Sequence, residues 1–200
     1  MRKSMMTVVL LFVLLMCSAC GNKDLQADSV EENTLLIKKD GSVQAAILEE
    51  FDKEYYDIEE AKKFIEDAIE EYNEEKGKEC VKFNDIKESP FEKNKICLIV
   101  TYENMDTYDE VIGAKIRHLT IDEAAEEGII PEELTSLREG RAVDGETVAK
   151  ENTQYKVLAL SSRFHVIVEG KIKYYTNAAV LNNAAVQTAG KKKRAVIIYK

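Results

Sequence analysis

The chain has 200 residues, of which 45% are hydrophobic and 32% are charged. This composition is typical of a globular protein with one core and excludes a disordered chain. The 37 acidic residues outnumber the 28 basic ones, which gives a net charge of −9. A nucleic-acid-binding protein would carry a basic surface instead, so we expect no nucleic-acid partner.

The start of the chain has the layout of a secretion signal. Arg2 and Lys3 form a short positive region, and an apolar run of ten residues follows at 7–16. Ten residues are too few to cross the ~30 Å hydrocarbon core of a bilayer as a helix, so this run is not an anchor by itself. Residues 17–19 then bring small side chains up to Cys20.

Ser-Ala-Cys at 18–20, followed by Gly21, resembles the lipobox of bacterial lipoproteins. In that family the cysteine is diacylated on its sulfur and becomes the first residue after cleavage. Cys17 departs from the pattern, because that position usually holds leucine or another aliphatic residue. The resemblance covers only the N-terminal signal. It implies a signal peptide at 1–19, lipidation of Cys20, and a place at the outer face of the bacterial cytoplasmic membrane.

An ordinary signal peptidase would cut the same bond, because 17–19 is also a small-x-small site. The product would be a soluble secreted protein with a free N-terminal Cys20. We favour lipidation, because few simple secretory signals place a cysteine directly after the cut. Two acyl chains would hold the protein stably on the membrane, whereas one chain binds only marginally.

The remaining chain divides into a tether and a body. Residues 20–32 start at the lipidated cysteine and are polar and aperiodic, which predicts a flexible tether with an r.m.s. span of roughly 20 Å. We expect residues 33–200 to form a single globular α+β domain. Without residues 1–19 the net charge is near −11, which suits a body held off an anionic bilayer.

A hairpin and a helix are the first elements that the body predicts. Asp40-Gly41 is a strong signal for a type I′ turn within a hairpin over 34–49, although the spacing from Val43 onward also fits a helix. Over 57–76 apolar residues recur on one helical face, with an N-cap and capping-box pattern at the start and Gly77 as the stop. We expect this long amphipathic helix to lie across a sheet.

Residues 80–86 and 95–101 predict a second hairpin. In the expected register Cys80 faces Thr101, which leaves Cys97 roughly 13 Å away, whereas a disulfide needs Cα atoms within ~7 Å. We therefore expect two buried thiols. A disulfide in a non-hairpin arrangement is the alternative, since export would permit one.

The second half of the chain predicts short helices in 105–137, then a long surface loop at 138–152, then mostly strands from Tyr155 onward. Glu169-Gly170 is expected to be a hairpin turn, and 177–187 is small and polar. The fold class that results is α+β, with an antiparallel or mixed β-sheet built from hairpins and packed against the one long amphipathic helix.

Neither a catalytic site nor a cofactor or metal site is predicted. His118 and His165 have no metal-ligand partner at helical or strand spacing, so we expect structural or exposed histidines. Ser161 and Ser162 lie near His165 in sequence, but a catalytic triad depends on geometry rather than nearness. Acidic clusters such as 70–75 lack the spacing of a calcium loop, which favours solvated faces.

Two surface features have alternative interpretations. The basic run Lys191–Arg194 could contact anionic wall polymer or lipid head groups, but a charged hairpin tip is favoured because such tips protect sheet edges. The tyrosine pairs at 55–56 and 174–175 could stack on sugars or peptides. Packing is favoured, with Tyr56 against Ala61 at the start of the helix.

Two classes of function are consistent with these features. The first is a membrane-anchored, non-enzymatic binding or interaction module of the cell envelope, with an envelope protein or polymer as its partner. The second is a surface hydrolase acting on cell-wall or external polymer. The sequence carries no nucleophile–base or metal motif, which favours binding.

Overall fold

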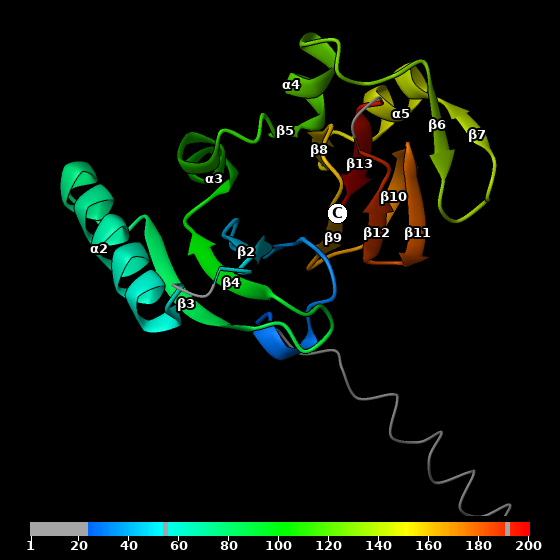
Figure 1. Cartoon of the computed structure of the whole chain (residues 1–200). Helices are drawn as coiled ribbons and strands as arrows, with labels where there is room; N and C mark the ends of the chain where they lie inside the picture. Colours follow the sequence, from blue (N-terminus) through cyan, green and yellow to red (C-terminus); the bar gives the residue numbers. More distant parts are fainter. Residues whose placement is uncertain (1–23, 54–55, 191–192) are drawn as a thin grey trace, which may run out of the picture.

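The computed structural model describes residues 24–53, 56–190 and 193–200. Over these ranges the chain forms an α+β fold with two β-sheets, where we expected one (Figure 1). The helices are α2 Ile58–Lys76, α3 Met105–Ile112, α4 Ile121–Glu126 and α5 Gly145–Glu151, with a 3-10 helix, η2, at Ala27–Ser29.

The larger sheet has seven strands within the described residues, in the order β11-β12-β9-β1-β2-β4-β3. Strands β1 and β9 pair in parallel and the other neighbours are antiparallel, so the sheet is mixed. The bounds are β1 Thr34–Ile37, β2 Val43–Glu50, β3 Val81–Glu88, β4 Lys95–Tyr102, β9 His165–Val168, β11 Ala178–Asn182 and β12 Ala185–Thr188.

The smaller sheet has six strands in the described part of the chain, in the order β5-β8-β13-β10-β6-β7, and all neighbours are antiparallel. The bounds are β5 Arg117–Thr120, β6 Glu133–Ser136, β7 Ala142–Asp144, β8 Lys156–Leu160, β10 Ile172–Thr176 and β13 Ala195–Tyr199.

The buried side chains form three layers of core. One cluster lies between the two sheets and includes Leu35, Val166, Leu158 and Ile197. A second lies between the smaller sheet and helices α4 and α5, which cover its far face (Figure 1). A third lies on the outer face of the larger sheet, under the N-terminal segment. Burial of apolar area in these layers is the main term that stabilises the fold.

The predicted hairpin over 34–49 is confirmed as β1 and β2, and the competing helix is not formed. The turn differs from the expected type I′. Only Gly41 has a positive φ, +92°, and its N–H donates to the carbonyl of Lys38 at 3.1 Å. Lys38 N–H in turn donates to Ser42 at 2.9 Å, which is a type I turn closed by a glycine bulge.

The helix expected over 57–76 forms as α2, with Asp57 accepting from the backbone N–H of Glu59 and Glu60 and Gly77 in the left-handed conformation. It lies beside β3 at the edge of the larger sheet (Figure 1). Its apolar side is only half covered, because no side chain of α2 is fully buried. The structure therefore places α2 along one edge strand and not across the whole sheet.

Residues 24–32 pack on the body, which corrects the expected tether. Ala27 and Val30 are 0% and 4% exposed, and they contact the outer face of β2 and β4 together with Leu25. The polar composition of this segment favoured a tether, and the spacing of two apolar side chains, Ala27 and Val30, by one helical turn was missed. The part of the body that the structure describes begins at residue 24, and the predicted signal peptide and lipidated Cys20 lie outside the described residues.

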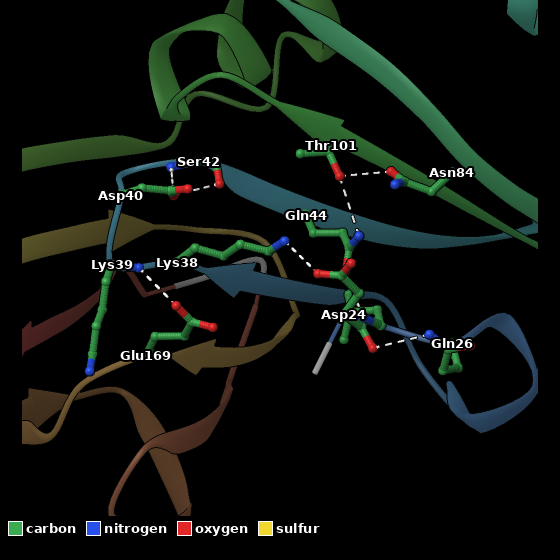
Figure 2. A network of polar contacts seen from close by, with 11 residues as sticks. Asp24, Gln26, Lys38, Lys39, Asp40, Ser42, Gln44, Asn84, Thr101 and Glu169 are labelled. Carbon is green, nitrogen blue, oxygen red and sulfur yellow. Dashed lines mark hydrogen bonds and ion pairs between the residues drawn. The ribbon is translucent and has the colours of Figure 1, made fainter. Parts of the chain in front are cut away.

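A polar network fastens this segment to the sheet, as Figure 2 shows. The backbone N–H of Leu25 donates to Gln44 Oε1 at 2.5 Å, and Gln44 Nε2 donates to Thr101 at 3.2 Å. The Thr101 hydroxyl donates to Asn84 Oδ1 at 2.7 Å. Gln44 is 1% exposed, so these bonds satisfy a buried amide that would otherwise be costly.

Strands β3 and β4 confirm the second hairpin, with a register two to three residues away from the expected one. Val81 pairs with Tyr102, and after a bulge Ile86 pairs with Leu98. The difference arises because β3 continues through polar residues to Glu88. Cys80 and Cys97 are buried free thiols, as expected, and they lie in core clusters on opposite faces of the sheet.

Two expectations for the second half of the chain are wrong, and the stretch 177–187, for which no element was predicted, lies in the β11–β12 hairpin. The loop at 138–152 contains β7 and α5, and Glu169-Gly170 is not a hairpin turn. There the chain passes from β9 in one sheet to β10 in the other. A Cβ on Gly170 would lie 2.5 Å from the carbonyl oxygen of Lys200, so glycine permits this crossing.

The expected charged hairpin tip at Lys191–Arg194 is also wrong in topology, because β12 and β13 belong to different sheets. Lys191 and Lys192 themselves lie outside the described residues, as do Glu54 and Tyr55. Among the helices that the structure describes, none is both long and apolar enough to cross a membrane.

Candidate functional site

A cleft of about 910 Å³ opens on the inner face of the larger sheet, where neither the smaller sheet nor α2 covers it. Its volume lies in the range of small-molecule sites, which are roughly 300–1,000 Å³ and mostly apolar. Its floor consists of Ala45, Ile47, Leu98 and Val100 from β2 and β4.

The floor is apolar because side chains alternate along a strand. Ala45 pairs with Val100 and Ile47 pairs with Leu98, so all four point to the same face. Ile47 and Leu98 stay only half-buried, whereas their neighbours on the outer face are covered by the N-terminal segment. The result is apolar surface that the fold itself leaves open.

Helix α3 closes one end of the cleft. Asn104 caps the helix by accepting from Thr107 N–H at 2.8 Å, and Gly113 ends it in the left-handed conformation. These boundaries place Tyr108 and Ile112 against the cleft, beside Tyr102 of β4. The rings of Tyr102 and Tyr108 meet edge to face with centroids 5.0 Å apart, which fixes the position of this wall.

The hydroxyl of Tyr108 is the unusual polar group at this end. It is buried and has no hydrogen-bond partner among the described residues. Burial raises the pKa of Tyr108, and it raises the pKa of Tyr102 to about 12. Tyr108 therefore stays protonated at neutral pH. A buried donor without a partner carries a cost in stability.

The loop Ser161–Phe164 forms the opposite wall, and buried Thr188 holds it in place. The backbone N–H of Phe164 donates to Thr188 Oγ1 at 2.8 Å, and Thr188 Oγ1 donates to the carbonyl of Ser162 at 2.7 Å. Gly190 packs against Arg163, where a Cβ would meet Arg163 Cβ at 3.0 Å. Both segments come from strand ends that are distant in sequence.

His118 and His165 both lie away from the residues that line this cleft. His118 Nε2 is 2.6 Å from the Tyr199 hydroxyl on the smaller sheet. His165 faces the outer side of the larger sheet, opposite to Val166 and Val168, as its alternation predicted. Ser161 therefore lines the cleft while the nearest histidine in sequence faces the other side of the sheet.

His165 borders a smaller hollow of about 440 Å³ under the N-terminal segment. The Nε2 of His165 and both side-chain amide atoms of the neighbouring Gln187 are buried without hydrogen-bond partners among the described residues. Buried polar atoms of this kind are commonly satisfied by ordered water. The apolar cleft is the better candidate site, because it is open and positions side chains from four segments.

Both histidines predict a loss of stability in mild acid. Burial lowers the pKa of His118, with a further contribution from Lys156, and burial lowers the pKa of His165. Below pH ~6.5 the histidines of the unfolded chain take up protons that the folded chain binds less readily. The free energy of unfolding therefore decreases as the pH is lowered. Urea unfolding at pH 7.0 and 5.5 measures this, and replacing both histidines with asparagine should flatten the slope. A stability that is equal or higher at pH 5.5 would contradict it.

Acidic residues at the start of α2 and a tyrosine of the second pair have structural roles. Glu59 and Glu60 are in the first turn of α2, where acidic side chains complement the helix dipole. Tyr174 packs on the core beneath α4 and α5, with its ring centroid 6.4 Å from that of Tyr155. In the part of the chain described by the structure, no group of three or more histidine, cysteine, aspartate or glutamate residues is placed to hold a metal ion.

Comparison with protein families, with curated proteins and with solved structures gives no match to this chain. The cleft was not predicted from the sequence. The sequence signal related to it is the strand at 96–102, which carries apolar side chains on both faces. In the structure only one face of this strand is fully covered, and the other forms part of the cleft.

Proposed function

We propose that this protein is a lipid-anchored, non-enzymatic binding module of the bacterial cell surface, and that the cleft is its ligand site. The observation that carries the proposal is the cleft itself, with an apolar floor that the fold leaves open. Sites of this size, with an apolar lining and few polar groups, are typical of ligand binding. A ligand of mainly apolar chemistry would cover surface that now meets water.

The proposed anchor would hold the body near the bilayer. Asp24 is fixed to the body, because it contacts Lys38 Nζ at 2.5 Å. Four residue steps separate Cys20 from Asp24, and an extended chain of that length spans at most about 14 Å. A lipidated Cys20 would therefore keep the outer face of the larger sheet close to the membrane, on a much shorter connection than the sequence suggested.

A neutral apolar dye tests the cleft as a ligand site. The mature chain, residues 20–200 with Cys20→Ser, is titrated with Nile red, whose fluorescence rises on transfer from water to an apolar site. We expect saturable binding with one site per chain. A fluorescence change that is absent or does not saturate would overturn the proposal.

Lipidation predicts that Cys20 alone carries the acyl chains. Cells grown with radiolabelled palmitate should label the wild-type protein, and Cys20→Ser should abolish the label. Cys17→Ser is the matched control and should keep it, because Cys17 lies within the segment that cleavage removes. Mature protein in the culture fluid with an unmodified N-terminal thiol would contradict the anchor.

A further inference from the structure

A basic side chain, that of Arg163, lies at the end of the cleft opposite α3, although the chain as a whole is acidic. Arg163 lines the cleft with its side chain 68% exposed. A cation is thus placed at one end of an apolar cleft.

The acidic groups at this end leave Arg163 able to accept a ligand. Glu32 approaches Arg163 at 3.6 Å, which is a loose contact between exposed groups, and such pairs contribute little. Glu49 follows Ile47 along β2 and marks the end of the floor. The Arg163 guanidinium has five N–H donors, so an anion can bind to it without displacing Glu32.

We propose that the ligand of the cleft is an anionic amphiphile, an acyl chain that carries a carboxylate or phosphate head. The chain lies along the floor of β2 and β4, with its far end toward α3, and the head binds Arg163. This inference rests on the proposed function of the cleft and adds the chemical class of its ligand.

The shape of the site favours a chain over a flat or bulky ligand. The floor from Ala45 to Glu49 spans four residue steps of β2, which is about 13 Å at the rise of a strand. It is narrow, because only β2 and β4 contribute to it between the two walls. Each methylene buried there contributes about fourfold in affinity, so an acyl chain gains most from a long apolar floor.

The position of the body is consistent with such a ligand. A protein that is held within about 14 Å of a bilayer by a short N-terminal connection lies next to the membrane lipids from which acyl amphiphiles are released. A carboxylate head would indicate a free fatty acid, and a phosphate head would indicate a lysophospholipid. Both present the same chemistry to Arg163, and their relative affinities separate the two sources.

The experiment compares three ligands that share a ten-carbon chain and differ in the head: decanoate, decyl phosphate and 1-decanol. Each is titrated calorimetrically into the mature chain with Cys20→Ser. We expect at least one anionic ligand to bind about tenfold or more tightly than decanol, since a charge-assisted hydrogen bond is stronger than a neutral one. Octanoate should bind about fifteenfold more weakly than decanoate, because it has two fewer methylenes.

Arg163→Gln should remove the advantage of the anionic ligands and leave decanol binding unchanged. Arg141→Gln is the matched control, because Arg141 is also an exposed arginine paired with a glutamate, Glu139, and lies in the connection between β6 and β7 of the other sheet. Decanol that binds as tightly as both anions would overturn the anionic head, as would an anion preference that survives Arg163→Gln. In either case saturable Nile red binding would leave the proposed function standing. Failure of the dye as well would overturn both.

Discussion

Replacing Ile112 with glutamate should reduce Nile red binding by the cleft at least a hundredfold. Ile112 is the last residue of α3, lines the cleft and is 49% exposed, so the change does not disturb the core. A carboxylate at this position would have to lose water whenever an apolar ligand fills the cleft, and burying an unpaired charge costs several kcal/mol. The measurement is a fluorescence titration of the dye.

Val111→Glu provides a matched control on the same helix. Val111 is 42% exposed and precedes Ile112, but it is not among the residues that line the cleft. The same charge is therefore added one position away, and dye affinity should stay within about threefold of the wild type. Equal losses in both variants would indicate binding elsewhere on the surface or a general effect of charge, and would contradict the cleft as the site.

Val30→Asp should lower the free energy of unfolding by about 3 kcal/mol, because it buries a charge with no partner. Val30 is 4% exposed and packs with Ala46, Cys97 and Ile99 on the outer face of the larger sheet. Urea unfolding of the mature chain measures the difference.

Ser29→Asp is the control for this change. Ser29 is exposed, directly precedes Val30 and is the last residue of the 3-10 helix, and surface substitutions of this kind usually stay within about 0.5 kcal/mol. If Val30→Asp were as mild as Ser29→Asp, residues 24–32 would be a tether after all. The short connection between the membrane and the body would then be lost.

Elements with strong local signals were predictable from the sequence. The helix over 57–76 has a capping aspartate, a stop glycine and a long apolar stripe, and α2 has these boundaries. The hairpin at Asp40-Gly41 was correctly located for the same reason, although its turn type depended on the φ of a single residue. Long periodic elements are predictable because each additional turn repeats the same hydrophobic pattern.

Short elements and the division into two sheets were not predictable. Strand β7 has three residues and α5 has seven, which is too short for a hydrophobic period to show. Glu169-Gly170 has a turn-like sequence, and only the approach of Lys200 from the other end of the chain decides that it joins two sheets. Sheet membership is a tertiary property that local pattern does not contain.

The cleft is likewise a tertiary feature that the sequence did not predict. Its floor comes from two strands, and its walls come from α3 and from the segments at 161–164 and 189–190. A cleft is defined by the surface that remains uncovered, and the sequence gives no sign of which apolar face lacks a partner. The unpaired hydroxyl of Tyr108 likewise emerges only when its neighbours are known.

Native mass spectrometry of the mature chain, purified from bacterial culture without detergent, tests most directly whether the cleft holds an apolar ligand. We predict a fraction of molecules with the added mass of one small amphiphile, in the wild type and in Val111→Glu, and none in Ile112→Glu. Bare protein in all three samples, or an added mass that persists in Ile112→Glu, would contradict the cleft as a binding site.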